Sequence, residues 1–336
     1  MIKKIVQEHS RSRSDELFSK DELRELIARH LGADRVPRTI RVVTDTSDFF
    51  RVDYDDVVMF GERPYLCRNT EREGRFGIDD EPKFWVRRAV DLVDGTTKII
   101  KMVFHERFSV TVGGISFECV RSPKKEARIL DLVKGHPNFM QGFSVQDSAG
   151  NTVRIIEFIP GEKLADSVLK IGGTHEDYFF THFPGILDEY IVLVQAIRCL
   201  HEHGEKHGDI RRDHIIRDKR TGDCRWIDFD FNYIHKENMF GYDLFGLGNV
   251  IVYLAGRGDL HPQDLKQNNP AAYERLCSHD MNIIFNNRVV NLQKVYPYIP
   301  DALTYVLLHF SLGADVFYET TDQLLEDLQN ARTRLG

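Results

Sequence analysis

Two acidic clusters lie close together in the stretch 207–230, HGDIRRDHIIRDKRTGDCRWIDFD. Asp209 precedes one apolar β-prone run, Asp228 follows another, and the turn-like segment 219–223 separates the two runs. This pattern predicts a β-hairpin that presents Asp209 and Asp228 from neighbouring loops. Two carboxylates so placed suit phosphoryl transfer, in which one orients a hydroxyl nucleophile and the other holds Mg²⁺ on the phosphates. A surface hairpin with solvated acids is the alternative.

The spacing of these residues resembles the catalytic and metal loops of the protein-kinase-like superfamily, whose pattern is H-x-D, an Asn five residues on, and then D-F-G. HGD at 207–209 stands at the H-R-D position, and DFD at 228–230 stands at the D-F-G position. His214 occupies the position of the Asn. The resemblance implies that Asp209 acts on the acceptor hydroxyl and that the metal ligands are Asp228, His214 and Asp230. Imidazole is a softer donor than an amide oxygen, so we expect Mn²⁺ to serve as well as or better than Mg²⁺.

The segment after these loops leaves the branch of the superfamily open. IDFDF followed by YDLFGLGN resembles the aminoglycoside and choline kinases. Only 15 residues (243 − 228) separate Asp228 from Asp243, and no A-P-E follows, which favours a small-molecule acceptor or an atypical peptide site. GHPNF and DLFGLG, by contrast, resemble protein kinases more closely. Gly208 replaces the Arg of H-R-D, so we do not expect regulation by a phosphate on this segment.

The composition predicts a globular soluble protein, because 42% of the 336 residues are hydrophobic and 29% are charged. The net charge of −7 argues against general binding to nucleic acid or to a membrane surface. The short basic pairs are interpreted as solvated faces or local phosphate contacts: Arg87-Arg88, Lys124-Lys125 and Arg211-Arg212.

The five cysteines show no C-x-x-C spacing, which favours a reduced intracellular protein. The N-terminal sequence MIKKIVQEHSRSRSDE lacks the apolar core of a signal peptide. No stretch approaches the roughly 20 apolar residues that a membrane helix needs. We therefore expect a cytoplasmic protein without a membrane partner.

Residues 1–50 are predicted to form a helical extension. Ser19 can cap a helix whose apolar positions recur at helical spacing until Gly32. The helix either packs on the main body or binds a partner, and packing is the favoured interpretation. From residue 51 to 160 the β-branched and aromatic runs predict an antiparallel sheet, as the kinase-like N-lobe requires.

Two features of this sheet carry chemistry in the resembled family. Gly74 and Gly77 resemble the second half of the Gly-rich loop that covers the phosphates, although the acidic residues after them also fit a plain hairpin turn. Lys101 in KIIKMVF resembles the V-A-I-K lysine, which contacts the nucleotide phosphates and takes part in transfer. Taken alone, Lys101 is interpreted as an edge-strand lysine.

The next helix and strand complete the predicted nucleotide site. Ser122 is an N-cap followed by Pro, and KEARILDLVKGHPNF resembles the kinase N-lobe helix, with Glu126 as the partner of the strand lysine. A surface glutamate in a first helical turn is the alternative. The strand ending near Pro160 resembles the interlobe hinge, whose backbone between Glu157 and Ile159 would bind adenine.

Residues 161–336 are predicted to be mostly helical, with a last helix capped by Thr320 and Gln323. Asp243 is predicted to hold the catalytic loop from below. His201 and His207 are interpreted as hydrogen-bonded structural histidines and His203 as exposed, since Gly204 removes the spacing of a zinc motif.

The prediction is thus an α+β protein of bilobal protein-kinase-like fold, with an N-lobe antiparallel sheet plus one helix and a mostly helical C-lobe. Its expected function is ATP-dependent transfer of the γ-phosphate to a hydroxyl group, with Arg211 neutralising charge on the transferred group. Ser/Thr of a protein is the predicted acceptor, and a small molecule is the alternative. A pseudokinase that binds nucleotide without transfer is the alternative from another class. His214, Asp230 and the weak Gly-rich loop motivate it.

Overall fold

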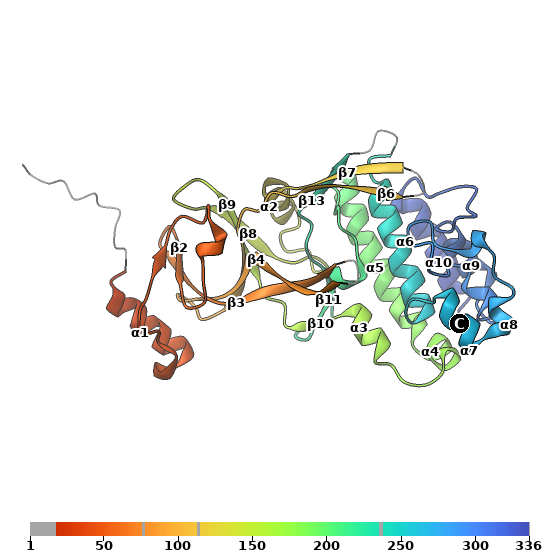
Figure 1. Ribbon diagram of the computed structural model, residues 1–336, viewed down its shortest axis with the longest axis horizontal. Coiled ribbons are helices and arrows are strands. Elements are labelled where there is room, and N and C mark those ends of the chain that lie inside the picture. The colour runs from red at the N-terminus through yellow and green to blue at the C-terminus, as the bar shows by residue number, and fades with distance from the viewer. Residues whose placement is uncertain (1–17, 76–77, 113–114, 235–237, 336) are drawn as a thin grey trace, which may run out of the picture. The chain divides into compact units, whose positions relative to one another are not determined.

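The computed structural model describes residues 18–75, 78–112, 115–234 and 238–335 (Figure 1). Contacts between Cα atoms divide the chain into two compact units. The first comprises Met1–Val103 and Val145–Ile155, and the second comprises Phe104–Ser144 and Ile156–Gly336. The boundaries expected near residues 50 and 160 stay predictions. Within the described ranges, no helix is both long and apolar enough to cross a bilayer.

The first unit begins with α1 (Lys20–Leu31), which starts and ends as its sequence signals predict. Ser19 caps it in a capping box with Glu22, and Gly32 ends it with φ of 101°. Leu23 and Ile27 are fully buried against the side chains of Val57, Leu66, Val90 and Leu92. The predicted packing of this helix on the main body is therefore confirmed.

A seven-stranded sheet, in the order β1-β2-β3-β4-β5-β9-β8, provides most of the rest of the first unit. Strands β2 to β5 form an antiparallel meander, and β1 pairs with β2 in parallel. The strands are β1 (Val42–Val43), β2 (Val57–Phe60), β3 (Arg63–Arg75), β4 (Ile78–Asp91), β5 (Thr97–Lys101), β8 (Gly142–Gln146) and β9 (Thr152–Glu157). Two short 3₁₀ turns, η1 (Ala33–Arg35) and η2 (Phe49–Arg51), lie before β2.

The second unit contains two small sheets and one helix that position the acidic loops. One sheet has the order β13-β7-β6 and the other β10-β11-β12. Helix α2 (Pro123–Leu132) is capped by Ser122 with Pro123 in its first turn, as predicted. The strands are β6 (Arg107–Val112), β7 (Ile115–Arg121), β10 (Gly161–Lys163), β11 (Ile215–Asp218), β12 (Cys224–Trp226) and β13 (Phe231–Ile234).

Helices make up the remainder of the second unit, and α5 and α6 form its centre. Helix α5 (Phe183–Glu202) is largely buried, as its continuous apolar stripe predicts, and α6 (Gly241–Gly256) is buried along most of its length. Helix α10 (Thr321–Thr333) packs on α5 and on α9 (Asp301–Leu308), and the predicted cap by Thr320 and Gln323 is confirmed.

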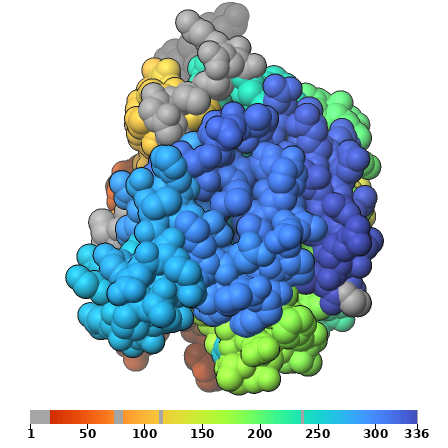
Figure 2. All heavy atoms as spheres, turned by 90° about the vertical axis from the view of Figure 1, so that its right-hand side faces the viewer, coloured from red at the N-terminus to blue at the C-terminus, as the bar shows by residue number. Residues whose placement is uncertain are grey.

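The shorter helices complete the unit, and the C-terminal segments form the surface in blue in Figure 2. These helices are α3 (Leu164–Leu169), α4 (His175–Thr181), α7 (Pro262–Asn268) and α8 (Pro270–Tyr273), with the 3₁₀ turns η3 (Arg212–His214), η4 (Ser278–Asp280) and η5 (Leu292–Lys294). The predicted α+β class, with an antiparallel-rich sheet followed by a mostly helical part, is confirmed.

Candidate active site

The predicted hairpin exists and brings the two acidic loops together. Strands β11 and β12 pair antiparallel, with Ile215 opposite Trp226. The pairing extends past the strands, because the Ile227 N–H donates to the His214 carbonyl at 3.0 Å. Asp209 lies just before η3 and Asp228 just after this pair, so both reach the open end of the hairpin.

His214 lies between the two acidic side chains. Its Nδ1 is 2.9 Å from the Asp209 carbonyl oxygen and 3.6 Å from Asp209 Oδ2, while its Nε2 is 3.7 Å from Asp228 Oδ2. The histidine is 3% exposed, whereas the carboxylate side chains are 14% exposed for Asp209 and 19% for Asp228. The structure therefore gathers these three predicted residues and leaves both acids accessible to a ligand.

Asp228 adopts an unusual backbone conformation. Its φ is 61°, which lies in the left-handed region that residues other than glycine rarely adopt. Such conformations cost free energy and persist where the surrounding structure imposes them, which is common at functional sites. In this conformation Asp228 Oδ2 lies 3.7 Å from His214 Nε2.

Asp243 anchors the loop that carries Asp209. Its carboxylate accepts the N–H groups of His207 and Gly208, each at 2.8 Å, and contacts His201 Nε2 at 3.0 Å. Burial opposes ionisation of this carboxyl, but the hydrogen bonds from His201 and the loop outweigh it and hold the pKa of Asp243 below its usual value. The predicted anchoring role of Asp243 is confirmed.

Lys125, in the first turn of α2, ties the two acidic loops together. Its ammonium group donates to the carbonyl oxygens of His207 at 2.7 Å, Phe229 at 3.0 Å and Phe231 at 2.6 Å. Burial lowers the pKa of Lys125 to about 8, so the group keeps its proton at neutral pH. The interpretation of Lys125 as solvated is wrong, because this residue is 2% exposed.

Asp230 does not join the other predicted metal ligands. Its carboxylate forms a buried ion pair with Arg121, the last residue of β7, and Arg121 also pairs with Glu106 at 3.1 Å. Burial opposes the charge on this guanidinium, but the carboxylates around it outweigh burial and raise the pKa of Arg121. The ion pair holds β13 against β7 at the exit of the DFD loop. Asp230 thus anchors the loop through Arg121, and its role as a metal ligand stays a prediction.

Two of the remaining donor groups, those of His214 and Asp228, fit a metal ion. Because a carbonyl oxygen can only accept, His214 Nδ1 carries the proton toward Asp209, and Nε2 faces the Asp228 carboxylate. A divalent cation shared by Nε2 and Asp228 would stabilise this arrangement, so these two residues fit a metal. Among the residues that the structure describes, no three His, Cys, Asp or Glu side chains gather closely enough to hold an ion. A cation here would therefore need phosphate or water oxygens as further ligands.

Lys101 and Glu126 are buried, each within its own unit. Lys101 ends β5, an interior strand between β4 and β9, and is 2% exposed. Glu126 in α2 is 0% exposed. The alternatives of an edge lysine and of a surface glutamate are therefore wrong, and both side chains carry the cost of a buried charge that requires compensation.

The other predicted nucleotide contacts are only partly described. Gly74 lies in β3, and Gly77 lies outside the described residues. Glu157 ends β9, and its N–H donates to the Gln141 carbonyl oxygen at 2.8 Å. Ile159 is 7% exposed. Arg211 forms a bidentate ion pair with Asp213, at 3.0 and 2.6 Å, so its charge already has a partner.

The burial of His207 predicts that the protein loses stability in acid. Its ring is 0% exposed beside Trp226 and Phe229, and burial lowers the pKa of His207 to about 3 from 6.5. Between these values the unfolded chain binds a proton that the folded chain excludes. The free energy of unfolding should therefore fall as pH falls through this window, by up to about 1.4 kcal/mol per pH unit from this residue.

Urea unfolding at a series of pH values between about 7 and 5 measures this slope. His207→Asn keeps an acceptor for the Asp209 N–H and should make the slope shallower. His203→Asn, at an exposed position, is the matched control and should leave the slope unchanged. Equal slopes in wild type and His207→Asn would show that His207 does not govern the acid response.

As predicted, His201 and His207 are buried structural histidines and His203 is exposed.

The chain is similar in sequence to several protein kinases. It is 23% identical over 214 residues to a putative ribosomal protein S6 kinase alpha-2 of Caenorhabditis elegans, which covers 62% of this chain and 23% of the relative. It is 24% identical over 219 residues to CDPK-related kinase 4 of Arabidopsis thaliana, covering 60% of this chain and 34% of that protein. CBL-interacting protein kinase 33 of Oryza sativa is 24% identical over 152 residues, or 45% of this chain and 30% of the relative. The chain thus spans only 23% to 34% of the length of these relatives.

No protein-family profile matches the chain. Among solved structures, the kinase domain of Mycobacterium tuberculosis PknI aligns with 83% of this chain and 99% of its own length, at 10% identity and a TM-score of 0.46. The sequence similarities confirm the resemblance to the protein-kinase-like superfamily that HGD and DFD predict.

Proposed function

We propose that the protein is a kinase-type phosphotransferase that moves the γ-phosphate of ATP to a hydroxyl group, with Ser or Thr of a protein as the acceptor. The observation that carries this proposal is the gathering of Asp209, His214 and Asp228 at the open end of one hairpin. Phosphoryl transfer needs little more from a protein than positioning and electrostatic stabilisation. The similarity to protein kinases supports the same class.

Asp209 orients the acceptor hydroxyl and takes its proton as the new bond to phosphorus forms. His214 holds the Asp209 backbone through Nδ1, and Asp243 and Lys125 hold the loop on its buried side. A divalent cation held by Asp228 and His214 Nε2 would supply positive charge against the phosphate oxygens. The nitrogen ligand suits Mn²⁺ better than Mg²⁺.

The roles of the other residues follow from the resemblance alone. The resemblance assigns Lys101 to the phosphates and Glu126 to the role of its counter-charge. It assigns the Gly74 to Gly77 motif to the Gly-rich loop, and the backbone at Glu157 and Ile159 to adenine. Arg211 neutralises charge on the transferred group once a ligand draws it from Asp213.

A pseudokinase is the second candidate, and the ion pair between Asp230 and Arg121 favours it. This pair engages the carboxylate that was expected to compensate for the missing Asn ligand. A weakened second metal position would allow nucleotide binding without efficient transfer. A small-molecule acceptor is the remaining alternative within the kinase class, and the short interval between Asp228 and Asp243 motivates it.

The test combines thermal-shift titration of the full chain with an ADP-release assay in the presence of a mixture of Ser- and Thr-containing peptides as phosphate acceptors. We expect ATP to raise the melting temperature only when Mn²⁺ or Mg²⁺ is present, since a ligand stabilises the state that binds it. ADP release should be faster with Mn²⁺ than with Mg²⁺. A metal-dependent shift without ADP release in either metal would establish the pseudokinase. No shift and no release would contradict both candidates.

A further inference from the structure

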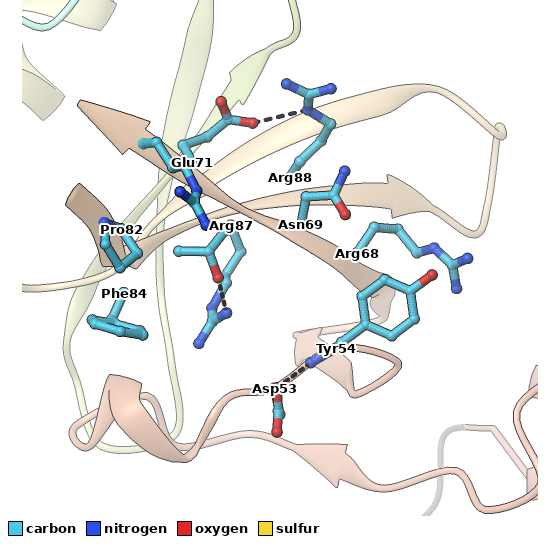
Figure 3. A pocket seen from close by; sticks show the side chains of 11 residues that line it. Asp53, Tyr54, Arg68, Asn69, Glu71, Pro82, Phe84, Arg87 and Arg88 are labelled. Carbon is cyan, nitrogen blue, oxygen red and sulfur yellow. Dashed lines mark hydrogen bonds and ion pairs between the residues drawn. The ribbon is translucent and has the colours of Figure 1, made fainter. Parts of the chain in front are cut away.

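The first unit contains a hollow of about 730 Å³ between β3, β4 and the segment that follows η2 (Figure 3). An irregularity in the sheet opens it. Thr70 pairs with Arg87 and the next residue, Glu71, pairs with Lys83, so three residues of β4 have no partner on β3. Such a bulge bends the strands locally and often lies beside a functional site.

Arg87 is a buried cation that lines this hollow. It is 6% exposed, and its terminal nitrogens donate to Thr70 Oγ1 and to the Val52 carbonyl, both uncharged acceptors. Its Nε has no acceptor, and no carboxylate pairs with it, among the residues that the structure describes. A guanidinium stays protonated when buried, and a buried charge without a counter-charge is costly. The hollow therefore has an uncompensated positive charge in its wall.

The other charged side chains do not supply that counter-charge. Arg68 pairs with Asp55 and lies over the Tyr54 ring at 4.5 Å, and Arg88 pairs with Glu71 at 2.8 Å, as Figure 3 shows for the latter. Arg72 is exposed and has no ion-pair partner in the described part of the chain.

Among the acidic residues that line the hollow, only Asp53 has no ion-pair partner in the described part of the chain. Its carboxylate accepts the Tyr54 N–H at 2.7 Å. Arg72 and Arg87 carry two positive charges against the one negative charge of Asp53, so the hollow keeps a net positive charge that a bound anionic group would compensate.

Aromatic rings border the same hollow. Tyr54 is 48% exposed and Phe84 is 40% exposed, and Phe84 contacts Phe50 with ring centroids 5.3 Å apart. Figure 3 shows Arg87 and the rings of Tyr54 and Phe84 around one space. Exposed rings beside arginines suit a ligand that carries an anionic group on an organic body.

This hollow is separate from the proposed nucleotide contact at Lys101. Lys101 pairs with Val86 across the sheet, and Arg87 pairs with Ile100. Because neighbouring residues of a strand point to opposite faces, Arg87 and Lys101 leave the sheet on opposite sides. A ligand on Arg87 therefore does not compete for Lys101.

We propose that the hollow binds a phosphate monoester, with the phosphate held by Arg72 and Arg87 and the organic group against Tyr54 and Phe84. The guanidinium fork matches phosphate oxygens, and the net positive charge of the hollow favours an anionic group. The volume exceeds that of the phosphate alone, so the ester group lies inside as well. A phosphorylated side chain of a peptide and a small phosphorylated metabolite share this chemistry.

Calorimetric titration of the full chain with three probes tests the proposal: phenyl phosphate, a pentapeptide with a central phosphotyrosine, and inorganic sulfate. We expect both phosphate esters to bind and sulfate to bind more weakly. Arg72→Ala should weaken ester binding about tenfold or more, the loss of one charge-assisted hydrogen bond. Arg35→Ala, which removes another exposed arginine far along the sequence, is the matched control and should change nothing.

The comparison of the two esters identifies the source of the ligand. Tighter binding of the phosphopeptide than of phenyl phosphate would indicate a peptide, and equal binding would indicate a small molecule. Arg87→Met should abolish binding of both esters. If the Arg87→Met variant does not fold, the Arg72→Ala result alone tests the proposal. The proposal is overturned if neither ester binds, or if Arg72→Ala and Arg35→Ala bind alike. The ATP-dependent shift of the proposed kinase should persist in Arg72→Ala, so the two proposals fail independently.

Discussion

Asp209→Asn is expected to lower ADP release at least about hundredfold while leaving the ATP-dependent thermal shift close to that of wild type. A positioned base typically contributes a factor of about 100 to 10,000, and Asn matches Asp in shape but cannot take a proton. The Asp209 side chain is 14% exposed and reaches the open end of the hairpin, where an acceptor hydroxyl would approach. Its backbone contacts to His207 and His214 do not depend on the carboxylate.

Asp228→Asn should behave differently, because the proposed role of Asp228 is to hold the metal. Asn tolerates the left-handed φ of 61° at this position, so the fold should survive the change. The metal-dependent part of the ATP shift should be lost together with turnover. Asp223→Asn, at an exposed position of the β11–β12 turn, is the control for both variants. Turnover that survives Asp209→Asn, or identical nucleotide shifts in the Asp209 and Asp228 variants, would refute the assigned roles.

Local signals were sufficient to predict most of the elements around the site. The turn-like segment between two apolar runs predicted the pairing of β11 with β12, and the caps at Ser19 and Ser122 predicted two helix starts. Asp243 was predicted as a buried, hydrogen-bonded carboxylate that holds the catalytic loop, and it does bind that loop. The turn and the helix caps lie within a few residues of the strands and helices that they determine, and Asp243 follows the acidic loops closely in the sequence.

Contacts between distant segments were beyond the reach of the sequence. Lys125 lies 82 residues before His207, whose carbonyl it binds, and nothing in the letters KK distinguishes the buried lysine from the solvated one. Arg121 lies 109 residues before Asp230. Every residue has a backbone carbonyl, so the sequence does not reveal which carbonyl groups accept hydrogen bonds from a lysine. Lys125 was misjudged for this reason.

Gly208 illustrates the same limit within the motif itself. In the sequence it is a departure from H-R-D, and its physical reason appears only in the structure. Its φ is 86°, and a Cβ at this position would lie 1.8 Å from the carbonyl oxygen of Phe231. That carbonyl is held by Lys125 Nζ at 2.6 Å, so it cannot withdraw without breaking the bond that joins the two loops. The glycine is thus required by the close approach of β13.

Gly208→Ala should therefore destabilise the protein more than Gly204→Ala does. Gly204 also has positive φ, 70°, but a Cβ there would meet nothing within 4 Å. Its change should cost about 1–2 kcal/mol of unfolding free energy, the cost of a left-handed alanine. Gly208→Ala carries the same cost plus about 1–3 kcal/mol for forcing apart a packed contact. Urea unfolding of the two variants measures the difference.

Gly208→Arg, which restores the H-R-D letters, should be at least as unstable as Gly208→Ala, because the arginine has the same Cβ. Its turnover should fall, since the Phe231 carbonyl and Lys125 must move and both position the acidic loops. If Gly208→Ala and Gly204→Ala lose equal stability, β13 can yield and the close approach does not constrain the motif. If the Gly208→Arg variant is stable and turns over faster than wild type, this fold does not require glycine at position 208. The glycine would then only mark the absence of the arginine found in H-R-D.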